Sequence, residues 1–243
     1  MNNLKTNFGK RRVSVNEKTS LVQGVFSDVA KKYDIMNDFM SFGAHRIWKS
    51  EFINLLNIQK NDKIIDVGSG TGDLIAKILA KKIHNPIYSV DLNAEMLKYG
   101  KKKFKNKKVN FIRANAEKLP FKEHAFDKYV ISFCLRNVTD INKALAESYR
   151  VLKPGGVFYC LEFSEPKNYI INKIYDNYKK NIIPWVGEKI AQNRKAYRYL
   201  EESISLFPNQ KKLLNTLKKV GFIEVKYINM FNGIVSIHRG FKV

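Results

Sequence analysis

The sequence is poor in cysteine and histidine, the two residue types that most often build disulfide frameworks and metal sites. Its 243 residues include two cysteines and four histidines. Cys134 and Cys160 both lie in apolar stretches, so we expect reduced, buried thiols in a cytosolic protein. The histidines are scattered, and no Cys/His spacing indicates a metal site. We therefore expect neither a disulfide scaffold nor a bound metal.

Long hydrophobic runs are also missing. No apolar stretch approaches the roughly 20 residues that a membrane-spanning helix needs, and the polar, basic first 19 residues do not resemble a secretory signal. Apolar residues make up 44% and charged residues 27% of the chain, which is the composition of a folded globular protein. The length favours one larger domain over two small ones.

Acidic residues are scarce relative to basic ones. The chain has 22 Asp and Glu against 44 Lys and Arg, which gives a net charge of +22. The densest basic run lies between Lys98 and Lys108. A solvated helix end and an attraction toward acidic surfaces are both open interpretations of this run. The joint richness in Lys, Asn and Ile also suggests compositional drift.

Short apolar segments alternate with helical patterns along the chain. The predicted strands are 63–67, 87–91, 109–113, 127–133 and 156–163, and the helices between them are 72–82, 94–104 and 141–152. A helix at 209–220 then precedes two closing strands, 222–227 and 235–241. Alternation of this kind indicates βαβ units and a parallel sheet covered on both faces. We predict an α/β, Rossmann-like fold whose mostly parallel seven-stranded sheet ends in an antiparallel hairpin.

No linker or repeat divides the chain, so we expect a single domain over residues 1–243. Within it we expect a flexible arm over 1–18, an N-terminal helical lid over 19–56 and a helical cap inserted at 167–207. The cap segment is rich in aromatic residues. It would cover the carboxyl edge of the strands, where open α/β sheets bind ligands.

The sharpest local motif is the loop Asp66–Asp73, which reads DVGSGTGD. Its glycines at positions 68, 70 and 72 let a backbone approach a ligand closely, but the dinucleotide pattern GxGxxG fails because position 73 is aspartate. A diphosphate prefers a helix N-terminus without carboxylates. Asp66 and Asp73 instead suit a cationic ligand such as S-adenosylmethionine, which has an ammonium and a sulfonium. A tight structural turn is the alternative.

Three further polar positions follow successive strands. Asp91 ends the second strand, where a carboxylate can accept hydrogen bonds from both ribose hydroxyls; a helix N-cap is the alternative. Asn115 and Ala116 follow the third strand and suit an adenine ring, and Ser132 lies near the end of the fourth. Together with the loop residues Asp66, Gly68 and Gly70, they predict an S-adenosylmethionine site.

Several segments have no generic methyltransferase explanation. They are FSDVAKKYDIMNDFM (26–40), SFGAHRIW (41–48), SFCLRNV (132–138), YRYLEESISLFP (197–208) and the HRG at 238–240. In these segments, and from about residue 24 to the end, the chain resembles the UbiE/MenG family of ubiquinone and menaquinone biosynthesis C-methyltransferases. The resemblance implies methylation of a ring carbon of a polyprenylated quinol, either demethylmenaquinol or 2-polyprenyl-6-methoxy-1,4-benzoquinol.

The resemblance also implies roles for individual residues. Arg136 and Asn137 of the LRNV segment, with Tyr33 of the KYD segment, would form the catalytic quinol pocket. The cofactor would contact Thr71, Asp91, Asn115, Ala116 and Ser132. A permanently charged Arg136 can stabilise a developing phenolate or hold a water that removes protons. An ordinary surface salt bridge is the alternative for Arg136.

Two positions depart from the family pattern. Asn193 occupies a segment in which the family commonly has aspartate, and Cys134 stands where glycine is usual, which would narrow the pocket. Two other assignments are open. His45 is either a base or a packed lid residue, and Glu162, which lies near the end of the fifth strand, is a candidate substrate contact.

A lipid substrate gives the positive charge a use. Each Lys or Arg near an anionic leaflet adds about 1 kcal/mol of attraction, so we expect a cytoplasmic protein in peripheral contact with the inner face of the membrane. A complex with other quinone-biosynthesis proteins is a further expected partner, and no nucleic acid is expected.

The sequence disfavours two rival functions. An RNA or DNA methyltransferase is disfavoured because the segment after the fourth strand, SFCL, lacks the proline of amine-methylating enzymes. A non-catalytic scaffold on the same fold is disfavoured by the intact glycine loop.

Overall fold

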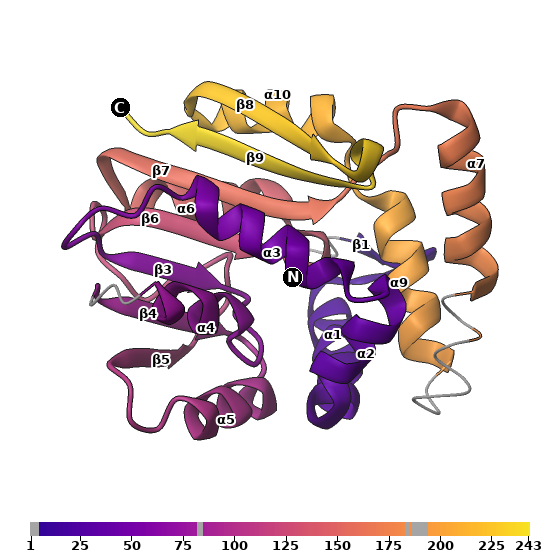
Figure 1. Cartoon of the computed structure of the whole chain (residues 1–243), viewed down its shortest axis with the longest axis horizontal. Helices are drawn as coiled ribbons and strands as arrows, with labels where there is room; N and C mark the ends of the chain where they lie inside the picture. The colour runs from indigo at the N-terminus through magenta and orange to yellow at the C-terminus, as the bar shows by residue number, and fades with distance from the viewer. Residues whose placement is uncertain (1–4, 82–84, 183–184, 186–193) are drawn as a thin grey trace.

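A computed structural model describes residues 5–81, 85–182, 185 and 194–243. Its main sheet has seven strands in the order β5-β4-β3-β6-β7-β9-β8 (Figure 1). The strands are β3 (Ile64–Val67), β4 (Ile87–Asp91), β5 (Val109–Arg113), β6 (Phe126–Ser132), β7 (Leu152–Phe163), β8 (Ile223–Met230) and β9 (Val235–Phe241). The first five run parallel to one another, whereas β9 is antiparallel to both β7 and β8. The predicted parallel sheet with a closing hairpin is confirmed.

Helices cover both faces of this sheet. On one face, α3 (Ala44–Leu55) and α4 (Asp73–Ala80) bury Phe52 and Ile78 against the central strands. On the other, α6 (Ile141–Val151) and α10 (Gln210–Val220) bury Leu145 and Leu217. All four residues of β3 are buried, as expected for a strand covered on both sides. The helix α5 (Ala94–Lys103) follows β4.

A third helical group lies beyond the carboxyl ends of the parallel strands (Figure 1). It comprises α1 (Val15–Val29), η1 (Ala30–Lys32), α2 (Tyr33–Ser41) and α9 (Arg194–Leu206). The helices α7 (Tyr169–Asn177) and η3 (Tyr178–Ile182) come before α9 in the chain. Val29, Met36 and Tyr197 form a small core here with Met96 of α5. The helices therefore cover the edge at which the glycine loop and the strand-end polar residues emerge. The helix α3, which we had assigned to the lid, belongs to the core of the sheet.

The N-terminal segment is ordered where the structure describes it. The strands β1 (Lys5–Phe8) and β2 (Arg11–Ser14) form an antiparallel hairpin. Phe8 stacks on Tyr199 with ring centroids 4.3 Å apart, and Thr6 Oγ1 donates to the Thr139 carbonyl at 3.0 Å. Ser14 then caps α1. The prediction of a flexible arm is thus wrong for residues 5–18, because contacts with distant residues hold the hairpin. Among the described residues, no helix is long and apolar enough to cross a bilayer.

Candidate active site

The glycine loop joins β3 to α4 in a backbone conformation that residues with side chains would adopt only with strain and steric clashes. Gly68 and Gly72 have φ of +69° and +89°, in the left-handed region. A Cβ on Gly68 would collide with Cys134 Sγ, and one on Gly72 would lie 2.6 Å from a ring carbon of Phe104. The unusual Cys134 therefore packs directly against the loop, and its thiol is one reason why position 68 must be glycine.

Asp66, at the end of β3, presents an unpaired carboxylate. Its side chain is buried, and Oδ2 has no hydrogen-bond partner. Burial, with the nearby charge of Asp91 adding to it, raises the pKa of Asp66 to about 8. A buried acceptor without a donor is costly to a fold, so this atom marks a place where a cationic group would be stabilised.

Asp91 is held rigidly at the end of β4. Its Oδ2 accepts from the Gly70 amide and its Oδ1 from the Asn93 amide, both at 2.8 Å. Asn93, and not Asp91, caps α5 by accepting from the Met96 amide at 3.0 Å. The N-cap alternative for Asp91 is therefore wrong. Its carboxylate faces a cavity, which is consistent with the ribose interpretation.

A cavity of about 100 Å³ lies at this edge of the sheet. Of the predicted cofactor residues, it is lined by Gly68, Gly70, Asp91, Asn115, Ala116 and Ser132. Asp66 and Thr71 line a second, larger cavity instead. Asn115 Oδ1 already accepts from the Glu117 amide at 2.9 Å, which fixes the side chain. The structure thus brings all eight predicted residues to two neighbouring cavities.

The larger cavity has a volume of about 630 Å³ and mainly apolar walls. Tyr33, Ser132 and Asn137 line both cavities, so the two adjoin. The aromatic wall of the larger one includes Trp48, Phe133, Phe163, Tyr175, Tyr178 and Tyr197. Burial raises the pKa of Tyr33 to about 12, which keeps its phenol protonated at neutral pH. The predicted catalytic residues all lie in this wall.

Arg136 is buried beside a carboxylate that the sequence did not pair with it. Its Nη1 donates to Glu162 Oε1 at 2.8 Å and to the Phe133 carbonyl at 2.6 Å, and its own amide donates to Glu162 Oε2 at 3.1 Å. Burial alone would lower the pKa of Arg136, but the charge of Glu162 outweighs it and the pKa is raised. The surface salt-bridge alternative is therefore wrong, and Arg136 is a buried cation.

Glu162 does not line either cavity. Its side chain is fully buried, and its oxygens accept from Arg136 and the Phe163 amide. Arg136 Nε has no partner among the described residues. Glu162 thus orients the guanidinium and balances its charge, and the expectation of a direct substrate contact finds no support in this geometry.

Asn137 is fixed by a tyrosine that sequence reasoning did not single out. Its Oδ1 accepts from the Tyr199 hydroxyl at 3.0 Å, and Nδ2 donates to the Phe133 carbonyl at 3.4 Å. Tyr199 in turn stacks on Phe8 of the N-terminal hairpin. No local pattern links these residues, which are more than 60 positions apart.

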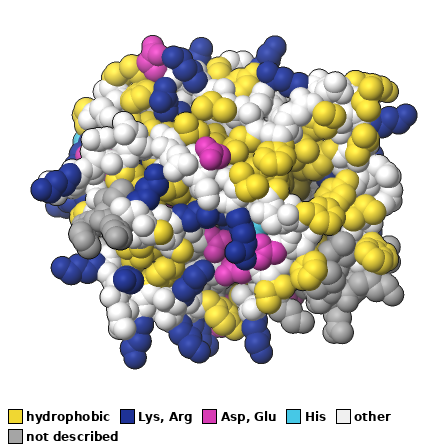
Figure 2. All heavy atoms as spheres, viewed as in Figure 1, with side chains coloured by type: hydrophobic (Ala, Val, Ile, Leu, Met, Phe, Trp, Pro, Cys, Tyr) yellow, Lys and Arg dark blue, Asp and Glu magenta, His cyan; other side chains and the backbone are white. Residues whose placement is uncertain are grey.

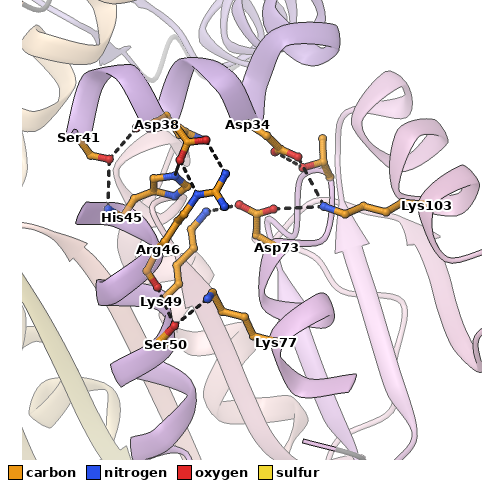
Figure 3. Close-up of polar contacts among 12 residues, drawn as sticks. Asp34, Asp38, Ser41, His45, Arg46, Lys49, Ser50, Asp73, Lys77 and Lys103 are labelled. Atoms are coloured by element: carbon orange, nitrogen blue, oxygen red, sulfur yellow. Dashed lines mark hydrogen bonds and ion pairs between the residues drawn. The ribbon is translucent and has the colours of Figure 1, made fainter. Parts of the chain in front are cut away.

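A polar network ties the lid to the glycine loop (Figure 3). Thr71 Oγ1 donates to Asp34 Oδ1 of α2 at 2.8 Å, and Lys103 lies 3.5 Å from both Asp34 and Asp73. Lys49 of α3 points to Asp73 and binds Oδ2 at 2.6 Å. Although burial opposes it, Lys49 lowers the pKa of Asp73. Asp73 is therefore already paired with lysines. The sequence predicts that both Asp66 and Asp73 bind a cationic ligand, but of the two only Asp66 is unpaired.

His45 lies in the wall of the larger cavity, in the first turn of α3 beside the lid helix α2. Its Nε2 lies 2.8 Å from Asp38 Oδ1, and Arg46 binds the same carboxylate through Nε and Nη2, each at 2.6 Å (Figure 3). Burial lowers the pKa of His45. The packed-lid interpretation fits these contacts. Asn193, the other departure from the family pattern, lies outside the described residues.

Comparison with solved structures defines the class of protein. A SAM-dependent methyltransferase from Thermotoga maritima superposes with a TM-score of 0.65 at 19% identity, covering 91% of this chain and 100% of that one. A SAM-dependent methyltransferase from Aquifex aeolicus gives a TM-score of 0.58 at 16% identity, covering 80% and 89%. The fold is that of the class I S-adenosylmethionine-dependent methyltransferases.

Sequence relatives define the family. The profile of the ubiE/COQ5 methyltransferase family matches residues 12–242. Proteins named ubiquinone/menaquinone biosynthesis C-methyltransferase UbiE are 49% identical in Rickettsia bellii (98% of this chain, 99% of the relative) and 48% identical in Pectobacterium atrosepticum (97% and 96%). The chain belongs to the ubiE/COQ5 methyltransferase family. The predictions of family, fold class and C-methyltransferase activity in quinone biosynthesis are confirmed.

The residues at the sheet edge fit S-adenosylmethionine. The orphaned Asp66 oxygen suits an ammonium, and the open loop at Gly70, where a Cβ would meet only Tyr33 Cε1 at 3.9 Å, leaves room beside the backbone. No group of His, Cys, Asp or Glu among the described residues has the arrangement of a metal site.

Asp66 makes a pH-dependent prediction. Because its pKa is raised to about 8 without ligand, the carboxyl must lose a proton before it pairs with an ammonium. Cofactor affinity should therefore fall as the pH is lowered below 8, by up to about tenfold per unit. Calorimetry in buffers of different ionisation enthalpy should show proton release on binding, and Asp66→Asn should abolish it. Proton release that persists in Asp66→Asn would contradict the assignment.

Proposed function

We propose that the protein methylates a ring carbon of a polyprenylated quinol, using S-adenosylmethionine as the methyl donor. The quinol is demethylmenaquinol, 2-polyprenyl-6-methoxy-1,4-benzoquinol, or both. One observation carries this proposal: a cavity at the sheet edge, lined in part by Asp91 and Asn115, adjoins a mainly apolar cavity of about 630 Å³, and Tyr33, Ser132 and Asn137 line both. The names of the curated relatives agree with it.

The residues of the sheet edge would hold the cofactor. Asp66 would bind its ammonium and Asp91 its ribose hydroxyls, while Asn115 and Ala116 would contact adenine. The loop at Gly68, Gly70 and Thr71 would approach it with backbone and hydroxyl groups, and Ser132 would line the boundary with the quinol. When bound, S-adenosylmethionine supplies an electrophilic methyl group on a sulfonium.

The catalytic wall would act on the quinol. A quinol hydroxyl that loses its proton to water would make the neighbouring ring carbon nucleophilic. A bond from that carbon to the methyl group would form as the methyl–sulfur bond breaks, with S-adenosylhomocysteine as the leaving group. The ring carbon would then lose its own proton to water, and the aromatic ring would be restored. Arg136 would stabilise the phenolate charge, since a preorganised cation in a site closed to water acts strongly on developing charge. Neutral Tyr33 and the fixed Asn137 would orient the ring. Holding both reactants in place is worth about 7–11 kcal/mol at best.

Peripheral contact with the inner face of the membrane, and association with other quinone-biosynthesis proteins, belong to the same proposal. They are supported by the lipid character of the quinol and the charge of +22. The alternative of an RNA or DNA substrate is not favoured, because the walls of the larger cavity are mainly apolar.

The quinone pool of cells that lack the protein tests this function. We expect demethylmenaquinone, the 6-methoxy benzoquinone precursor, or both, to accumulate at the expense of the methylated quinones, as measured by mass spectrometry. The unaltered gene should restore the methylated forms and a gene carrying Arg136→Lys should not. An unchanged quinone pool in the deletion strain would contradict the proposal.

A further inference from the structure

The larger cavity opens through an apolar mouth. Phe42, Ile47, Ile174 and Phe231 line this cavity and are nevertheless 83%, 54%, 65% and 50% exposed. They come from four separate places: the turn after α2, α3, α7 and the short helix η4 (Phe231–Gly233). We call these four residues the apolar mouth. Figure 2 shows hydrophobic side chains gathered on the side of the molecule that carries α7 and η4.

More exposed apolar residues lie on α2 and α7, two of the helices that line the cavity. Ile35 and Phe39, four residues apart on α2, are 58% and 51% exposed, and Tyr169 and Ile170 at the start of α7 are 79% and 67% exposed. These four, the outer rim, do not line the cavity. The α2 and α7 sides are joined beside the mouth, because Tyr178 OH donates to the Met40 carbonyl at 2.6 Å and its ring lies 6.2 Å from that of Phe42. Large contiguous apolar patches on a protein surface mark interaction sites.

The backbone at the mouth is in an unfavourable conformation at both of its aromatic residues. Phe42 has φ of +48° and Phe231 has φ of +47°. The left-handed region is unfavourable for bulky residues, and asparagine or glycine adopts it more readily. Since Phe42 is 83% exposed, little packing offsets this strain. Strain of this kind is typically retained where it serves function.

The charged residues around the apolar patch indicate what kind of surface it binds. Exposed lysines lie along the α7 side of the patch: Lys167 just before α7, Lys173 within it and Lys180 in η3 just after it. Of the acidic side chains on and beside these elements, Asp38 pairs with Arg46 and His45 and Asp176 pairs with Lys179, whereas Glu51 and Glu165 are exposed. An apolar patch with a basic surround complements a leaflet that has anionic headgroups over a hydrocarbon interior.

We propose that the apolar mouth and outer rim dock on the surface of an anionic lipid bilayer. This inference rests on the proposed function, in which the substrate has a prenyl chain. Docked in this way, the cavity opens directly into the leaflet, and the chain passes from lipid to protein without entering water. Phe42 and Ile174 insert at the mouth, while the lysines of α7 and η3 contact headgroups.

Vesicle binding of the full chain tests this surface. We expect binding to vesicles of phosphatidylcholine with phosphatidylglycerol, and much weaker binding to phosphatidylcholine alone. The double variant Phe39→Ser/Ile170→Ser should bind about tenfold more weakly, since two exposed apolar side chains no longer enter the bilayer. The matched control Tyr99→Ser/Ile223→Ser, which changes exposed apolar residues of α5 and β8, should bind as the unaltered protein does.

A second variant separates docking from folding. Phe42→Asn relieves an unfavourable backbone conformation, so its thermal unfolding midpoint should be equal to or above that of the unaltered protein while vesicle binding weakens. The outer-rim variant should methylate a water-soluble quinol with a short side chain at the unaltered rate, and should be impaired only with a long-chain quinol embedded in vesicles.

These experiments distinguish failure of the docking surface from failure of the proposed function. Three results would overturn the docking surface. The outer-rim variant could bind vesicles as tightly as the unaltered protein does, or the control variant could lose as much binding as the outer-rim variant. The unaltered protein could also bind neutral vesicles as tightly as anionic ones. Ultracentrifugation showing that the outer-rim substitutions dissociate a dimer would overturn the docking surface as well. If the unaltered protein binds anionic vesicles but methylates neither the short-chain nor the long-chain quinol, the docking surface stands and the proposed function fails.

Discussion

The Arg136→Lys variant is expected to bind S-adenosylmethionine with unaltered affinity and to methylate its quinol on the order of 100-fold more slowly. Lysine keeps the positive charge that Glu162 requires, because removing one partner of a buried pair costs about 3–5 kcal/mol of stability. It lacks the planar guanidinium that contacts both Glu162 and the Phe133 carbonyl. The charge therefore remains, but it is misplaced relative to the developing phenolate.

Three measurements check this variant: calorimetry for the cofactor, single-turnover kinetics for methyl transfer and thermal unfolding for the fold. Glu162→Gln is its companion, because it keeps Arg136 but weakens the contact that orients it. It should lower the rate constant for transfer with little change in cofactor affinity. Normal turnover in Arg136→Lys would remove the guanidinium from the mechanism.

Replacing Asp91 should act on the other reactant. Asp91→Ala should weaken S-adenosylmethionine binding by roughly 100-fold, because hydrogen bonds to a charged group contribute about 1.5–3 kcal/mol each. The substitution also removes the hydrogen bond that the Gly70 amide donates to Asp91 Oδ2 at 2.8 Å, so the glycine loop is held less firmly. Titration calorimetry measures the dissociation constant directly.

Asp28→Ala is a suitable control for that variant, since Asp28 is an exposed carboxylate of the lid helix α1 and lines neither cavity. Its affinity should equal that of the unaltered protein. An Asp91→Ala protein that is folded and binds the cofactor normally would refute the ribose assignment.

The sequence was most informative where structure is locally determined. The strands 87–91 and 109–113 were predicted with the bounds that the structure shows, because short apolar runs between turn residues have few alternatives. The glycine loop and Asp91 were found for the same reason: a ligand site at the carboxyl edge of a parallel sheet follows from chain order alone.

Pairings between distant residues could not be read in that way. The ion pair of Arg136 with Glu162 joins residues 26 positions apart, and the Lys49–Asp73 pair joins residues 24 apart. The N-terminal hairpin looked like a polar arm because only one of its eight residues, Val13, is buried. Its order comes from Phe8 stacking on Tyr199, a contact that depends on the tertiary fold.

The most direct test of the central claim is to follow the methyl group. Purified protein is incubated with S-adenosylmethionine carrying a ¹³C-methyl group and with each demethylated polyprenyl quinol, and the products are analysed by NMR and mass spectrometry. The account predicts a labelled methyl bonded to a ring carbon of at least one quinol, formed on the order of 100-fold more slowly by Arg136→Lys. Label on a quinol oxygen, or no transfer to either quinol by a protein that binds the cofactor, would contradict it.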